Sequence, residues 1–144
     1  MARPEDPSDE ASREVWPPDA WITEGPDGSA ALLGGFSPTS GRHHFPPAAI
    51  CPYSGADDVE TVALSSRGTL WAWTAVTAAP PGYEGPVPYG FGVVELDPEG
   101  LRVIGRLTEA DPGALVFGQP MQVVVEQLAG GQRVWAFAPT GAAP

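Results

Sequence analysis

The sequence contains no lysine, and its seven basic residues are all arginines, set against 18 acidic residues. The formal net charge is −11 at pH 7, so the chain is strongly acidic. Binding to nucleic acid depends largely on cations that neutralise phosphates, and an acidic chain would repel the phosphate backbone. We therefore predict that the protein has no nucleic-acid partner.

The sequence also has little cysteine and no long hydrophobic run. Cys51 is the single cysteine, so an internal disulfide is excluded. No apolar stretch approaches the roughly 20 residues that cross a bilayer, and no basic amphipathic segment offers a surface anchor. The N-terminal residues have neither the basic region nor the apolar core of a signal peptide. These absences predict a cytoplasmic protein without a membrane partner.

Familiar catalytic motifs are missing as well. The sequence has no nucleophile elbow, dinucleotide fingerprint or phosphate-binding loop. Cys51 with His43 or His44 is the one available Cys/His pair, and nothing near it in sequence suggests an activated thiolate. The acidic residues at 57–58 and 109–111 fall in predicted turns, where carboxylates are usually solvated. We predict no catalytic residue in this chain.

Glycine and proline, in contrast, are abundant, with 18 of each among 144 residues. Both residues interrupt regular elements, so this composition excludes a helical bundle and a coiled coil. Hydrophobic residues make up 42% of the chain, which is enough for one core. The composition thus predicts one compact domain with loose ends.

A period of two in the hydrophobic pattern predicts strands from residue 59 onward. The alternation is clearest in 70–76, 101–107 and 121–126. Turn sequences at 97–100 and 129–132 join neighbouring strands as hairpins, which makes those strands antiparallel.

The alternation lapses between residues 108 and 119, where Asp111 is predicted to cap a short helical turn that starts at Pro112. The resulting order is three strands, a short helical connection and two strands. This order is typical of a five-stranded OB-type barrel. A sandwich would need about seven strands, so we predict an all-β fold built on such a barrel.

The chain divides by composition into four segments. They are a loosely structured N-terminal arm (1–30), a ribbon-like segment (31–58), the barrel (59–139) and a flexible tail (140–144). Trp16 and Trp21 are large apolar anchors of the arm, and they could dock on this protein's own core or on a partner.

The ribbon-like segment contains two similar turns, at 37–41 and 51–55, separated by an apolar Phe45-Pro-Pro linker. These turns open a longer pattern, which continues through three further runs at 62–76, 79–89 and 94–97. Together the runs closely resemble the DUF35 family, whose members combine a zinc ribbon with an OB fold. The resemblance covers about residues 31–138 in collinear order.

This resemblance implies a function. Members of the family typically act as small subunits beside thiolase-fold enzymes that work on acyl-CoA, including thiolases, acyltransferases and aldolases that shorten steroid side chains. We therefore expect a non-catalytic accessory subunit of a hetero-oligomer, such as a heterotetramer, that stabilises a thiolase-type or retro-aldolase-type partner and helps form its acyl-CoA channel. Steroid side-chain or aromatic-acid degradation would be the pathway. The alternatives are a free-standing acyl-CoA-binding or lipid-binding OB module and, disfavoured by charge, an OB-fold nucleic-acid binder.

The chain departs from the family at the zinc site. Family members usually bind zinc through four cysteines, and the equivalent positions here are Ser37, Ser40, Cys51 and Ser54. One thiolate cannot hold a structural zinc, and His43 and His44 are adjacent residues that tend to point apart. We predict no zinc and no other cofactor, with a CoA thioester as substrate of the complex. In place of the metal we expect a small apolar plug formed by Phe36, Phe45, Ile50 and Tyr53.

A long loop at 78–89 is stiffened by four prolines and is the predicted partner-binding feature. The predicted contacts with the partner or its acyl-CoA channel are Tyr83, Pro86, Tyr89, Phe91, Trp71 and Trp73. The alternation places Trp71 and Trp73 on one face of a strand, where they could also belong to the core.

Four arginines are candidates for contact with CoA phosphates: Arg67, Arg102, Arg106 and Arg133. Each could instead be a solvated charge or form an ion pair with Glu60, Glu95 or Glu126. The sequence does not choose between these roles.

Overall fold

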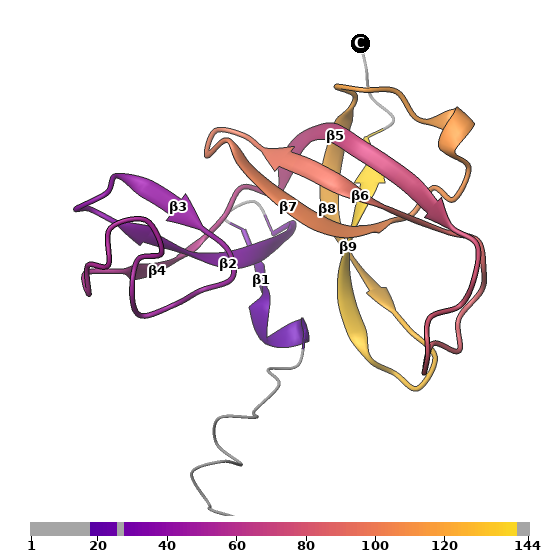
Figure 1. Ribbon diagram of the computed structural model, residues 1–144, viewed down its shortest axis with the longest axis horizontal. Coiled ribbons are helices and arrows are strands. Elements are labelled where there is room, and N and C mark those ends of the chain that lie inside the picture. The colour runs from indigo at the N-terminus through magenta and orange to yellow at the C-terminus, as the bar shows by residue number, and fades with distance from the viewer. Residues whose placement is uncertain (1–17, 26–27, 141–144) are drawn as a thin grey trace, which may run out of the picture.

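The computed structural model describes residues 18–25 and 28–140. Figure 1 shows a small sheet on one side of the molecule and a barrel on the other. The small sheet contains β1 (Ile22–Glu24), β2 (Ala30–Ser37), β3 (Arg42–His44) and β4 (Glu60–Ala63), preceded by the 3-10 turn η1 (Pro18–Trp21). The barrel contains β5 (Arg67–Val76), β6 (Tyr89–Leu96), β7 (Leu101–Leu107), β8 (Pro120–Gln127) and β9 (Arg133–Pro139), with the 3-10 turn η2 (Pro112–Ala114) between β7 and β8.

The barrel is closed, in the strand order β5-β6-β7-β9-β8, with β8 paired back to β5. The β7 and β9 strands pair in parallel, and the other neighbours are antiparallel. The side chain of Asp111 accepts a hydrogen bond from the backbone N–H of Gly113 at 2.9 Å and so caps η2, as the sequence predicts. The predicted all-β fold with a five-stranded OB-type barrel is therefore confirmed.

The small sheet forms around β2, which pairs with β1, β3 and β4. Because Glu60–Ala63 pairs with β2, this sheet extends past residue 58, and the barrel starts at Arg67 rather than at residue 59. Part of the predicted N-terminal arm is also regular structure, since Ile22–Glu24 pairs with β2 as a strand. These boundaries depend on pairing between distant segments, which composition does not reveal.

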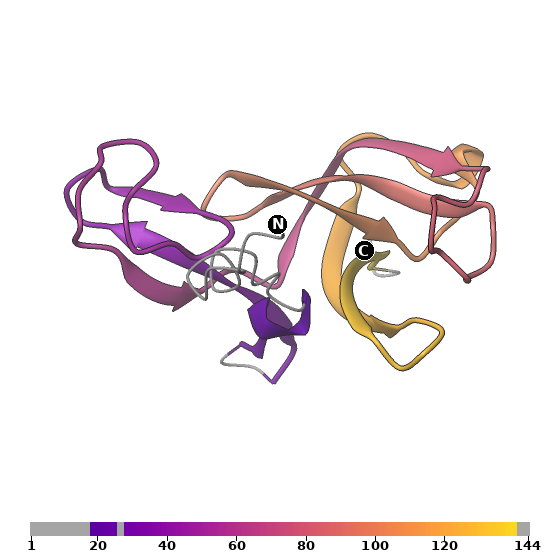
Figure 2. The same ribbon diagram turned by 60° about the horizontal axis from the view of Figure 1, so that its bottom comes forward.

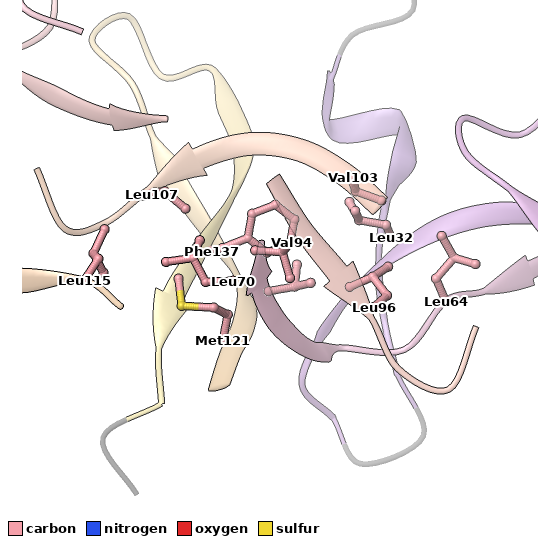
Figure 3. Packing of buried hydrophobic residues seen from close by; sticks show 11 residues of the cluster. Leu32, Leu64, Leu70, Val94, Leu96, Val103, Leu107, Leu115, Met121 and Phe137 are labelled. Carbon is pink, nitrogen blue, oxygen red and sulfur yellow. The ribbon is translucent and has the colours of Figure 1, made fainter. Parts of the chain in front are cut away.

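One hydrophobic core joins the sheet to the barrel. Figure 3 shows Leu32 of β2 and Leu64 beside the barrel residues Val103 and Leu96. Further inside the barrel, the cluster continues through Leu70, Val94, Leu107, Leu115, Met121, Val123 and Phe137. Figure 2 shows the two parts side by side, with β2 running from the barrel toward the far end of the small sheet. The sheet is therefore attached to the barrel by shared burial of apolar side chains.

A β-bulge in β5 separates the two tryptophans that the sequence places on one face. The register shifts between Leu70 and Ala72, so that Leu70 pairs with Val94 whereas Ala72 pairs with Val93. Because of the extra residue, side chains after the bulge point to the opposite face of the sheet from the one that strict alternation predicts. Trp73 therefore packs against the core, whereas Trp71 lies on the outer face with 41% of its surface exposed. The predicted shared face is wrong.

None of the helices in the described ranges combines the length and apolarity that a bilayer crossing requires.

Candidate functional site

An apolar groove of about 550 Å³ lies between η1 and the outer face of β6 and β7. We call it the β7 groove, and its lining residues are Trp21, Phe45, Pro46, Phe91, Arg102, Val103, Ile104, Gly105, Arg106, Val134 and Trp135. Ile104 is 57% exposed and Phe91 is 38% exposed, although both side chains are apolar. The groove therefore leaves hydrophobic surface in contact with water.

Three aromatic rings from distant segments form one wall of the groove. Trp21 lies edge-on to Phe45 at 5.6 Å between ring centroids, and Phe45 lies edge-on to Trp135 at 5.4 Å. The indole N–H of Trp135 donates a hydrogen bond to the backbone oxygen of Ile104 at 3.1 Å, which ties the wall to β7. Trp21 therefore docks on this protein's own surface, whereas Trp16 lies outside the described residues.

Gly105 allows the wall to approach β7 closely. A Cβ atom at this position would lie 2.8 Å from the ring of Phe137 and 2.9 Å from the indole nitrogen of Trp135. Any larger residue would push one of these rings away, so the glycine permits the close approach of Trp135 to β7. Nothing in the hydrophobic pattern alone distinguishes this glycine from the many others in the chain.

The proline-rich loop is held against the barrel by Arg106. The guanidinium of Arg106 lies over the ring of Tyr89 at 4.5 Å, and its Nε donates to Glu126 at 3.0 Å. The hydroxyl of Tyr83 in turn donates to the backbone oxygen of Pro86 at 2.9 Å. Partial burial lowers the pKa of Arg106, but hydrogen bonds to Glu126 and Tyr83 outweigh it and raise the pKa above its ordinary value.

The predicted contact residues therefore divide between two neighbouring hollows. Phe91 lines the β7 groove, whereas Pro86 and Tyr89 line a second hollow of about 520 Å³ beside the loop. Arg106 lines both hollows. Trp71 and Trp73 line neither of them.

The four candidate arginines are not brought together as a phosphate site. Arg102 lies over the ring of Trp71 at 4.0 Å and within 3.9 Å of Glu95, at the edge of the groove. Arg106 forms an ion pair with Glu126. Arg67 and Arg133 line neither the groove nor the hollow beside the loop. Arg102 is thus the arginine best placed to meet a ligand in the groove.

The four positions equivalent to zinc ligands do come together in the small sheet. The Cys51 thiol donates to the hydroxyl of Ser40 at 3.5 Å, and the Ser40 N–H donates to the hydroxyl of Ser37 at 3.4 Å. Hydrogen bonds with the hydroxyls of Ser40 and Ser54 lower the pKa of Cys51 to about 6, although its burial opposes this change. Cys51 is only 1% exposed, so external reagents do not reach it.

This donor set does not fit zinc. Three hydroxyls and one thiol replace the four thiolates of a structural site, and neutral hydroxyls are poor ligands. His43 stacks on Phe36, and His44 donates from Nδ1 to the backbone oxygen of Pro46 at 3.0 Å. Across residues 18–25 and 28–140, no three His, Cys, Asp or Glu side chains are grouped as ligands of a metal ion.

The expected apolar plug is also absent from the described structure, and that prediction is wrong. Phe45 packs in the wall of the groove, and Phe36 packs on His43. Ile50 is 52% exposed, and Tyr53 is 44% exposed beneath the guanidinium of Arg42. Ile50 and Tyr53 lie in the segment between β3 and β4, outside the strands, so the four side chains do not gather into one cluster.

Comparison with known proteins relates the barrel to a characterised fold. Residues 61–126 match the family model of the C-terminal OB-fold domain of ChsH2. A solved structure described as the Ltp2-ChsH2(DUF35) aldolase superposes with a TM-score of 0.63 over 76% of this chain and 84% of that chain, at 23% identity. The two chains therefore share a fold.

Two curated relatives are more similar in sequence. Benzoylsuccinyl-CoA thiolase subunit BbsA of Thauera aromatica is 32% identical over 100 residues, which cover 69% of this chain and 67% of that protein. A DUF35 domain-containing scaffold protein of Pyrococcus furiosus is 32% identical over 97 residues, which cover 67% of this chain and 70% of that protein. Identity over this much of both proteins, together with the OB-fold barrel, shows that the chain belongs to the DUF35 family.

Proposed function

We propose that this chain is a non-catalytic scaffold subunit that docks on a thiolase-fold enzyme of acyl-CoA metabolism. The observation that carries the proposal is the β7 groove, where Ile104 and Phe91 remain exposed beside an ordered aromatic wall. Contiguous apolar surface of this kind usually marks an interaction site. The names of two relatives support the proposal, since one is a scaffold protein and the other a thiolase subunit.

The partner, rather than this chain, would supply the catalytic groups. Cys51 is buried, and its thiol is hydrogen bonded to Ser40 rather than to a histidine. Of the residues that line the groove, only Arg102 and Arg106 are ionisable, and neither is a general base at neutral pH. We assign the groove to binding and the reaction to the partner.

The substrate of the complex would be a CoA thioester that undergoes carbon–carbon cleavage, by thiolysis or by a retro-aldol reaction. Arg102 at the edge of the groove would contact a phosphate of CoA, and the neighbouring loop would face the acyl-CoA channel. We propose a cytoplasmic heterotetramer that contains no zinc and acts in the breakdown of a steroid side chain or an aromatic acid.

Co-purification from the native source tests the proposal, with the retained protein identified by mass spectrometry. The tagged chain should retain a thiolase-fold protein in a fixed ratio. Ile104→Glu should reduce this recovery at least about tenfold without lowering the melting temperature, because it places a charge in the apolar groove. Val116→Glu is the matched control, since Val116 is 62% exposed but does not line the groove, and it should bind like the unaltered chain.

Two results would contradict the proposal. The first is equal recovery of the partner by Ile104→Glu and Val116→Glu. The second is a chain that elutes alone as a folded monomer and binds a CoA thioester without help, which would favour a free-standing binding module.

A further inference from the structure

The carboxylate of Asp58 binds the first of the two turns in the ribbon-like segment, at 37–41. Asp58 Oδ1 accepts a hydrogen bond from the hydroxyl of Ser37 at 2.6 Å. Asp58 Oδ2 accepts from the hydroxyl of Thr39 at 2.6 Å and from its backbone N–H at 2.9 Å. Both oxygens of one carboxylate are therefore used to fix the first turn to the segment that leads into β4.

The hydrogen bonds continue from Asp58 into the second turn. Ser37, which is completely buried, accepts from the N–H of Ser40, and the hydroxyl of Ser40 accepts from the thiol of Cys51. Cys51 also shares a hydrogen bond with the hydroxyl of Ser54. The network thus reaches all four positions where a zinc ribbon has its ligands.

The two turns have the same backbone shape, although one carries hydroxyls and the other carries the thiol. The N–H of Gly41 donates to the oxygen of Ser37 at 2.7 Å, and the N–H of Gly55 donates to the oxygen of Cys51 at 2.9 Å. Both glycines have positive φ, at 67° and 74°. The chain has therefore kept a pair of matched turns while it has lost three of the four thiolates that would bind a metal.

We propose that Asp58, acting through Ser37, Thr39 and Ser40, replaces the metal ion as the group that holds the two turns together. A structural zinc supplies a fixed charge at which several donor groups converge. Here the fixed charge is the Asp58 carboxylate, and hydroxyl and backbone N–H groups donate to it. The apolar residues nearby do not compete for this role, because Ile50 and Tyr53 are exposed.

The pKa of Asp58 agrees with this role. Hydrogen bonds from the hydroxyls of Ser37 and Thr39 lower the pKa of Asp58 below its ordinary value. The carboxylate therefore stays charged at neutral pH and remains an acceptor for all three donors.

The first experiment combines metal analysis with hydrogen–deuterium exchange on the purified full-length chain. The chain should hold less than about 0.1 zinc per molecule, and a chelator should leave its melting temperature unchanged. Asp58→Asn should accelerate amide exchange about tenfold in 37–41 and 51–55 and leave the barrel unchanged. Asp57→Asn is the matched control, because Asp57 is an exposed neighbour, and it should behave like the unaltered chain.

Thr39→Val provides a milder test if Asp58→Asn fails to fold. It removes one hydroxyl donor but keeps the backbone N–H, so the acceleration of exchange should be smaller and confined to the same turns. One zinc ion per molecule of the unaltered chain would overturn the proposal. Amide exchange in Asp58→Asn and Thr39→Val that is no faster than in Asp57→Asn would also overturn it.

The converse experiment asks whether zinc can replace Asp58. The triple variant Ser37→Cys, Ser40→Cys and Ser54→Cys restores four thiols at positions that the structure already brings together. With Asp58→Asn added, this chain should bind one zinc ion per molecule, and zinc should return exchange in 37–41 and 51–55 to the slow rate of the unaltered chain. Failure to bind zinc, or zinc binding without recovery of slow amide exchange, would contradict the proposal that Asp58 takes the structural role of the metal.

Discussion

The barrel and the small sheet are stabilised in different ways, although they share one core. The barrel closes its hydrogen-bond ladder and buries large apolar side chains, including Phe137 and Met121, inside it. The small sheet has Leu32 and Leu64 at the end that meets the barrel, whereas its far end is held by polar contacts around Asp58. A thin sheet cannot enclose a core of its own, so it depends on its neighbour and on hydrogen bonds.

The same contrast bears on function. The barrel presents its outer face at the β7 groove, and the part of the chain before the barrel supplies Trp21 and Phe45 to complete the groove wall. The groove is therefore a joint product of both regions. If the two parts came apart, the wall would be lost even though each set of strands remained intact.

The largest expected effect is that of Phe137→Ala, because this side chain is completely buried in the shared core. The substitution should lower the free energy of unfolding by about 3–5 kcal/mol, as measured by urea denaturation. Phe117→Ala is the control, since Phe117 is 69% exposed, and it should change stability by less than ~0.5 kcal/mol. The small sheet should unfold in the same urea transition as the barrel. Two separate unfolding transitions would contradict the conclusion that the two parts share one core.

A smaller effect is expected at the bulge in β5. Trp73→Ala removes a ring that packs on the core and donates to the oxygen of Pro112, so it should cost about 2–3 kcal/mol. Trp71→Ala removes an exposed ring beneath Arg102 and should cost no more than about 1 kcal/mol. Urea denaturation of both variants measures the difference, and equal losses would mean that the two rings share a face after all.

The smallest effect concerns the pH dependence of the small sheet. The folded-state pKa of Cys51 is about 6, below the ordinary value of 9.0, so the folded state binds this proton more weakly than the unfolded state. The ionised Cys51 therefore contributes to the free energy of unfolding in full above pH 9, and this contribution is lost as pH falls through 6. The difference in melting temperature between the unaltered chain and Cys51→Ser should grow from pH 6 to pH 9.

Ultraviolet absorbance of the thiolate provides an independent measure of the same titration. The pKa of Asp58 is lowered and that of Arg106 is raised, so neither group titrates in this range. Parallel melting profiles for the unaltered chain and Cys51→Ser would contradict the assignment.

Much of the barrel could be predicted, because its strands alternate regularly and its turns carry their own signals. Asp111 and Pro112 predicted a capped turn where η2 lies. The bulge at Trp71 could not be predicted, since one extra residue on a strand leaves no mark in an alternating pattern. The prediction that Trp71 and Trp73 share one face of the strand was therefore wrong.

The candidate site was less predictable than the fold. The proline-rich loop was identified from its composition, and Tyr89 and Phe91 do line hollows. The pairing of Arg106 with Glu126, which removes this arginine as a free phosphate contact, joins β7 and β8, which follow each other in sequence but are not neighbours in the barrel order. Asp58 lies next to the similar Asp57, and nothing in the pattern distinguishes the carboxylate that meets Ser37 from the one that is solvated.

Local chemistry alone determined the all-β class, the hairpin at 97–100 and the capped turn at Asp111. These features depend on a residue and its near neighbours, so the sequence states them directly. The tertiary structure decided how Trp21, Phe45 and Trp135 meet in one wall and which carboxylate joins the two turns. Such contacts form only when the closed barrel and the shared core bring distant segments together, because their geometry is set by packing rather than by local preference.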